Sequence, residues 1–84
     1  MLTTGIIEVD IHGMTAYEAK SHIDNILRKA NGSVYRIRVI HGYHGGTSLK
    51  SMLTDEYSYE RSKKVKKIQG GSNPGITELV LREF

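Results

Sequence analysis

The first half of the chain alternates between two periodicities, and this order constrains the fold more than any other feature. From Gly5 to His12, and again from Val34 to His41, apolar residues occupy every second position, which is typical of a strand with one buried face. Between these segments, apolar residues recur at three- and four-residue spacing, typical of an amphipathic helix that starts at the capping box Thr15/Glu18 and ends at Asn31-Gly32. A strand, a helix and a strand in this order predict a crossover unit. Such a unit pairs its strands in parallel, with a right-handed connection in about 98% of cases.

The second half predicts a shorter helix and two short strands. Helical spacing of apolar residues covers Thr47 to about Tyr57. Two extended segments follow, Lys63 to Gln69 and Ile76 to Leu81, separated by a turn that contains the sequence's single proline, Pro74. The predicted order is therefore βαβαββ. This is an α/β fold of the two-layer sandwich type, with two helices on a four-stranded mixed sheet and residues 1–84 in a single domain.

Composition narrows the classes of protein that such a chain can represent. With 84 residues there is room for one small core and none for a separate cofactor domain. No apolar run approaches the roughly 20 residues that span a bilayer, and the first residues lack a signal-peptide pattern. We therefore expect a soluble cytoplasmic protein, with no membrane partner, that is a monomer or a weak dimer. The absence of cysteine excludes disulfides and thiolate chemistry. The net charge is only +3, so the distribution of charge matters more than its total.

Both predicted parallel strands end in the same three residues. Ile11-His12-Gly13 closes the first and Ile40-His41-Gly42 closes the second. In open α/β sheets, ligands bind outside the carboxyl ends of the strands. Asp10 lies two residues before His12 and so on the same face, where a carboxylate can orient an imidazole for general acid–base chemistry. We therefore take Asp10, His12 and His41 as candidate catalytic residues. In the alternative interpretation, the histidines bond loop carbonyls and only stabilise the turns.

A glycine-rich segment follows the second strand and leads directly into the second helix. The backbone N–H groups of such a loop, together with the positive end of a helix dipole, favour a phosphate group. The candidate phosphate or nucleic-acid contacts in this segment, with the glycine after His12, are Gly13, Gly42, Tyr43, His44, Gly45, Gly46 and Thr47. The two large side chains of the loop also suit stacking on a base. An ordinary tight turn is the alternative.

Basic residues gather in two places, the third predicted strand and the second one. The candidate nucleic-acid contacts there are Lys63, Lys64, Lys66, Lys67, Arg36 and Arg38. A basic run of this kind can neutralise several phosphates and makes binding strongly salt-dependent. Lysines also protect an edge strand from pairing with another chain, and the sequence does not separate the two interpretations.

Metal ligation is an alternative use of the same histidines. His41 and His44 stand three residues apart, and Asp10 and His12 lie nearby in the predicted sheet. A glycine loop fixes no ligand geometry, however, and the helical histidine spacing of metallohydrolases is absent. We predict no metal or other cofactor and keep a divalent cation as the alternative.

These motifs resemble those of the Smr domain, the small MutS-related domain, over nearly the whole chain. The segment from Val9 to Thr15, with Glu18-Ala19, resembles the family's opening LDLHG motif and the helix after it. The segment from Val39 to Gly42 and the loop after it resemble the second motif, HGxGxG, although His44 stands where that motif has a glycine. The residues that resemble the family's closing segment are Asn73, Gly75 and Thr77.

The resemblance implies a domain that binds nucleic acid and, in several members, nicks DNA or cleaves RNA. At the matching positions, His12 oriented by Asp10 would deprotonate the attacking hydroxyl or water, and His41 would protonate the leaving oxygen, or the two histidines would exchange these roles. A second hypothesis is a binding module without catalysis, which recognises DNA, RNA or a ribosome-associated nucleic acid. A third is a protein-interaction adaptor whose basic residues serve solubility.

Overall fold

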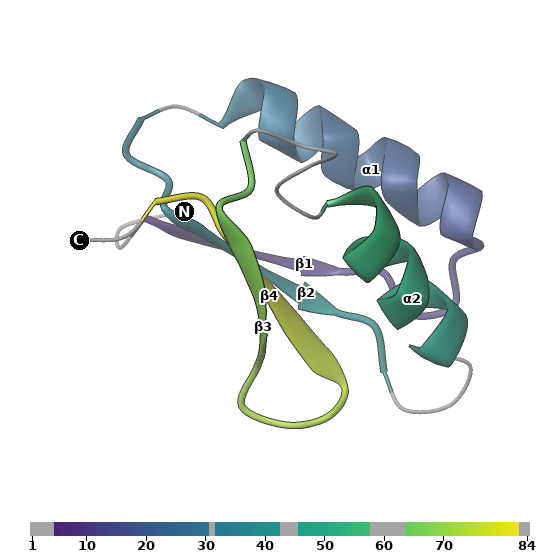
Figure 1. Ribbon diagram of the computed structural model, residues 1–84. Coiled ribbons are helices and arrows are strands. Elements are labelled where there is room, and N and C mark those ends of the chain that lie inside the picture. Colours follow the sequence, from purple (N-terminus) through teal and green to yellow (C-terminus); the bar gives the residue numbers. More distant parts are fainter. Residues whose placement is uncertain (1–4, 31, 43–45, 58–63, 83–84) are drawn as a thin grey trace.

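The computed structural model describes residues 5–30, 32–42, 46–57 and 64–82. Its elements follow the order β1 (Ile6–Asp10), α1 (Ala16–Lys29), β2 (Arg36–Ile40), α2 (Gly46–Glu56), β3 (Lys67–Gly70) and β4 (Ile76–Val80) (Figure 1). The predicted βαβαββ order is confirmed. Within the described ranges, no helix is long and apolar enough to cross a membrane.

The strands form one mixed sheet in the order β1-β2-β4-β3. β1 and β2 are parallel, as the crossover unit predicts, whereas β4 runs antiparallel to both β2 and β3. Both helices cover the same face of this sheet (Figure 1), so the molecule has the two layers expected from the sequence. The opposite face of the sheet is covered by neither helix.

Apolar side chains from the sheet and from both helices meet between the two layers. Strand alternation sends Ile37 and Val39 of β2 toward the helices, and the apolar stripe of α1 covers them. The buried cluster consists of Val9, Ile11, Ala19, Ile23, Leu27, Ile37, Val39, Leu49, Leu53, Tyr57, Val65 and Leu79. The predicted capping box starts α1: Thr15 Oγ1 accepts the Glu18 N–H at 3.1 Å, and Glu18 Oε1 accepts the Thr15 N–H at 3.0 Å.

Three strand ends meet at one edge of the sheet, which we call the carboxyl edge. It is formed by the residues that follow β1 and β2 and by the turn that precedes β4. The register places the last residue of β1 beside the last residue of β2, with the first residue of β4 on its other side. Beyond the strands, the N–H groups of His41 and Gly42 both donate to Gly75 O, at 2.9 and 3.0 Å. The chain after β2 is thereby tied to the turn before β4.

The third strand is shorter than the sequence predicts. It covers Lys67–Gly70 rather than residues 63–69, and Lys63 itself lies outside the described residues. Before the strand, Lys64 contacts the helix layer, where its ammonium donates to Leu27 O at 2.8 Å. Because Lys64 is held at the end of α1, regular pairing with β4 begins only at Lys67.

Candidate functional site

Asp10 and His12 form an exposed pair at the carboxyl edge. Asp10 is the last residue of β1 and faces away from the helices, because its neighbour Val9 is buried in the core. The same carboxylate oxygen, Oδ1, lies 2.5 Å from His12 Nδ1 and accepts the His12 backbone N–H at 3.0 Å. The side chains of His12 and Asp10 are 70% and 51% exposed. A solvent-accessible, hydrogen-bonded imidazole–carboxylate pair is therefore present where the sequence predicts it.

The hydrogen bonds of the pair define which nitrogen of His12 can exchange a proton. The imidazole and the backbone N–H of His12 hold the pKa of Asp10 below its ordinary value, so the carboxylate is ionised at neutral pH and can only accept. Nδ1 of His12 must then be the donor to Asp10. In the neutral ring, Nε2 carries the free lone pair, and it has no bonding partner among the described residues.

His41 lies at the same edge but is buried, with 2% of the residue exposed. Its Nε2 lies 2.8 Å from the hydroxyl of Thr77, and its Nδ1 lies 3.1 Å from Gly42 O. Because a carbonyl only accepts, Nδ1 is the donor to Gly42, and Nε2 accepts the Thr77 O–H. Both ring nitrogens are thus engaged. The Nε2 bond holds the end of β2 against β4, and the Nδ1 bond holds the backbone that follows β2.

The two histidines lie on opposite faces of the sheet. Alternation in β2 carries His41 to the helix side, with Val39, whereas His12 follows Asp10 on the other side. The residue beside His12 is instead Gly42: a Cβ built on Gly42 would lie 3.5 Å from the Cβ of His12. The structure therefore brings His12 to the backbone after β2, and not to the ring of His41.

The turn before β4 completes this part of the edge. Gly75 packs against Gly42, since a Cβ built on Gly75 would lie 3.4 Å from Gly42 Cα. The Asn73 side chain holds the turn, because its Oδ1 accepts the Gly75 N–H at 2.8 Å. The sequence alone predicts no site role for Asn73, Gly75 or Thr77. The predicted strand order does indicate such a role for the turn before β4, because a strand antiparallel to β2 must begin at the edge where β2 ends.

The glycine segment after β2 is described only in part. Tyr43, His44 and Gly45 lie outside the described residues, and Gly46 and Thr47 begin α2. The first turn of α2 contains no acidic residue, whereas the first turn of α1 contains the capping Glu18. Of the two helices that begin at the carboxyl edge, α2 therefore has the amino end better suited to an anion.

Gly13, in the turn after β1, is exposed and has a φ of +82°, which favours glycine. No atom of a described residue lies within 4 Å of a Cβ built on Gly13.

The described members of the basic set predicted from the sequence do not gather at the carboxyl edge, and Lys63 lies outside the described residues. Arg36 and Arg38 lie on the sheet face without helices, and both pair with Glu78 of β4, at 2.8 and 3.3 Å. Arg38 also lies 3.6 Å from Glu8 of β1. These arginines cross-link three strands and have their charges balanced locally.

Among the lysines of the predicted third strand, Lys66 and Lys67 are exposed, and Lys64 bonds the end of α1. In the described part of the chain, no group of three histidine or carboxylate side chains could hold a metal ion.

This protein is a small βαβαββ domain with an exposed imidazole–carboxylate pair at the end of its first strand. The Smr domain model matches residues 9–75, and the chain belongs to the Smr domain family, which is associated with nucleic-acid binding and nicking. The matched span contains Asp10, His12, His41 and the turn before β4.

Solved structures agree with this assignment. The crystal structure of the Smr domain of MutS2 from Thermus thermophilus superposes with a TM-score of 0.78 at 27% sequence identity, covering 92% of this chain and 99% of that one. No curated protein sequence matches the chain.

Proposed function

We propose that this Smr domain binds nucleic acid at the carboxyl edge and cleaves a phosphodiester bond there, by DNA nicking or RNA cleavage. The observation that carries the proposal is the exposed His12, whose Nδ1 is committed to an ionised Asp10 and whose Nε2 is free to take a proton. Family membership supports the substrate class.

In the proposed reaction, Nε2 of His12 removes the proton from the attacking hydroxyl or water. The attacking oxygen forms a new bond to phosphorus, the bond to the leaving oxygen breaks, and that oxygen takes a proton from solvent water. The backbone around Gly42, which lies beside His12, and the amino end of α2 hold the phosphate. Asp10 positions the ring and stabilises the imidazolium that forms.

The acid role that the sequence suggests for His41 stays a prediction. Burial of its ring and the bonds to Thr77 and Gly42 favour a positioning role instead, in which His41 fixes the backbone that the phosphate contacts. A positioning role and an acid role differ in pH dependence. If His41 is the acid, the rate of His41→Asn loses the limb that falls at high pH, whereas loss of positioning lowers the rate equally at all pH values.

The test is cleavage of end-labelled RNA and DNA, with and without a chelator. We expect His12→Ala to lower the rate by about 10²-fold or more while leaving nucleic-acid affinity nearly unchanged, because the contribution of a general base is lost. His22→Ala is the matched control, since His22 is an exposed histidine of α1 that lies outside the pair. A wild-type protein that cleaves neither substrate, or a His12→Ala variant with full activity, refutes the enzymatic proposal.

The products distinguish the nucleophile. An RNA product with a 2′,3′-cyclic phosphate indicates attack by the RNA's own 2′-hydroxyl, and a product from DNA indicates attack by water.

A second candidate function is a binding module without catalysis, for DNA, RNA or a ribosome-associated nucleic acid. The burial of His41 favours it, because only one of the two candidate imidazoles is left exposed at the edge. A clean wild-type protein that binds with steep salt dependence and leaves the strand intact would establish this function over the first.

A further inference from the structure

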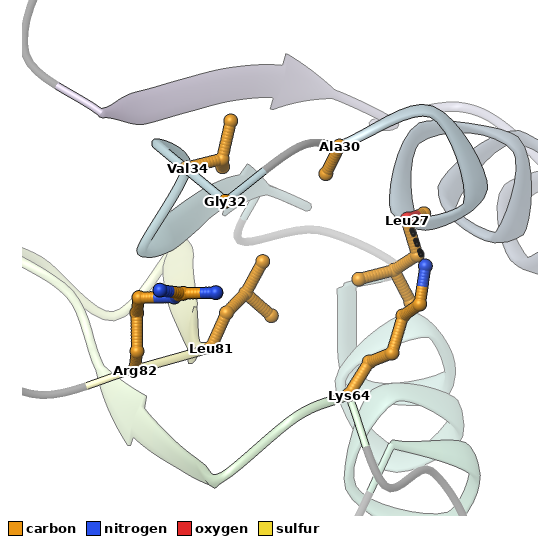
Figure 2. Close-up of a pocket in the computed structure, with 7 residues that line it drawn as sticks. All are labelled: Leu27, Ala30, Gly32, Val34, Lys64, Leu81 and Arg82. Atoms are coloured by element: carbon orange, nitrogen blue, oxygen red, sulfur yellow. Dashed lines mark hydrogen bonds between the residues drawn. The ribbon is translucent and has the colours of Figure 1, made fainter.

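A pocket of about 300 Å³ lies at the edge of the sheet opposite to the carboxyl edge (Figure 2). It is formed by the last turn of α1, the segments before β2 and before β3, and the residues that follow β4. Its described lining includes the apolar residues Leu27, Val34 and Leu81 and two basic residues, Lys64 and Arg82. The proposed reaction uses none of the residues that line this pocket.

Figure 2 shows the two basic side chains reaching in from opposite sides, with Leu81 between them. Lys64 has a structural reason to be there, because its ammonium satisfies Leu27 O at the end of α1, at 2.8 Å. Arg82 has none. Its guanidinium makes no hydrogen bond or ion pair with any described residue, and its Nη2 would lie 3.7 Å from a Cβ on Gly32. A free guanidinium at the rim of an apolar pocket is suited to bind an anion.

The composition of the walls restricts the chemistry of that anion. The volume is at the small end of the range for organic ligands, about 300 to 1,000 Å³, and the apolar walls suit a flat or apolar group rather than a bare ion. None of the described residues that line the pocket is a carboxylate. Lys29 in the last turn of α1 and Lys66 before β3 are exposed basic residues on the elements that border it. An organic phosphate with an aromatic ring meets all of these conditions.

We propose that this pocket binds one nucleotide unit, with the base against Leu27, Val34 and Leu81 and the phosphate at the guanidinium of Arg82. The choice of ligand rests on the proposed function, which it deepens by adding a second nucleic-acid contact remote from His12. The unit is either a free mononucleotide or one nucleotide of a bound strand, since both present the same chemistry. The lysines around β3 then serve this second contact rather than the carboxyl edge.

The test is a titration of the ¹⁵N-labelled protein followed by NMR. The backbone amides of Gly32 and Val34 report on the pocket, and the amide of His12 reports on the carboxyl edge. The probes are AMP, adenosine, inorganic phosphate and a short single-stranded oligonucleotide. We expect AMP to shift the pocket amides at lower concentration than adenosine or inorganic phosphate, because only AMP has both the ring and the charge. Inorganic phosphate acting as well as AMP overturns the proposal, as does the absence of any shift with AMP.

Substitution tests the assigned residue. Arg82→Gln keeps a polar side chain but removes the charge, and we expect it to weaken AMP binding at the pocket roughly tenfold, the loss of one charge-assisted contact. Lys50→Gln is the matched control, because Lys50 is an exposed lysine of α2 that does not line the pocket. Equal weakening by both substitutions would mean nonspecific charge attraction and would overturn the proposal.

The two sources of the ligand are distinguished by the oligonucleotide. Shifts at Gly32 and Val34 with the strand, lost in Arg82→Gln, support a strand contact, and shifts with AMP alone support a free nucleotide. Failure of this proposal is separable from failure of the proposed reaction. His12→Ala can lack cleavage activity and still bind AMP at the pocket, whereas Arg82→Gln can lose pocket binding and still cleave.

Discussion

Gly13 and Gly42 offer a matched pair of substitutions at the carboxyl edge. Each follows a histidine and has a φ of +82°, a conformation that strains a residue with a side chain by about 1–2 kcal/mol. Among the described residues, an added Cβ on Gly13 meets no atom within 4 Å, and on Gly42 it meets the His12 Cβ at 3.5 Å, which is an ordinary contact. Because neither methyl group clashes, we expect Gly13→Ala and Gly42→Ala to lower the free energy of unfolding by similar amounts, about 1–2 kcal/mol each.

Urea unfolding followed by circular dichroism measures the free energy of unfolding of each variant relative to the wild type. For a domain of this size, each kcal/mol corresponds to a fall in Tm of roughly 4–8 °C, so thermal unfolding checks the same value. A gap of more than about 2 kcal/mol between the two variants would refute the reasoning, since backbone strain would then not be the dominant contribution.

We expect the same two variants to differ in cleavage activity. The methyl group of Gly42→Ala lies beside His12, where the phosphate is proposed to bind, so we expect this variant to lose more activity than Gly13→Ala. Equal losses would support the phosphate contact that the sequence predicts for Gly13. Full activity in Gly42→Ala would contradict the placement of the phosphate beside β2.

The remaining predictions concern stability. Thr77→Val removes the hydroxyl that bonds His41 Nε2 and leaves a buried nitrogen unsatisfied, so we expect a loss of about 1–3 kcal/mol in urea unfolding that Thr77→Ser restores; wild-type stability in the valine variant would contradict the bond. The pKa of Asp10 lies below its ordinary value of 3.8 because His12 bonds the carboxylate, so the stabilisation is present above that value and is lost as pH falls through the lower folded-state pKa. Asp10→Asn should therefore show a Tm that varies less with acidification between about pH 5 and pH 2, and an unchanged pH dependence would contradict this assignment.

The element order could be predicted from the sequence because it depends on local periodicity. Alternating apolar residues predict strands at β1 and β2, and the capped apolar stripe predicts a helix at α1. A helical crossover between two neighbouring strands then predicts that they pair in parallel. The start of β3 could not be predicted in this way. Lys64 has the local pattern of a strand residue, yet its side chain bonds Leu27, 37 positions earlier in the chain.

The exposed half of the candidate site could also be predicted, because Asp10 and His12 are two residues apart on one strand. The environment of His41 was harder to assign. Its shared motif with His12 suggests equivalence, although its alternation with Ile37 and Val39 places it on the buried face. Its partner Thr77 lies 36 positions away and enters only through the pairing of β2 with β4. The shared motif predicts that His41 lies at the carboxyl edge, and the alternation along β2 predicts that it faces the helices.

The sequence by itself determined the strands and helices, their order, the parallel pairing of β1 with β2, and the bond between Asp10 and His12, since all of these follow from neighbours along the chain. Only the tertiary structure decided that His12 lies beside Gly42, that His41 is buried against Thr77, and that Arg82 and Lys64 line one pocket. The physical reason is the same in each case. Strand register and the packing of one layer on another set which distant groups meet, and the local pattern does not specify these contacts.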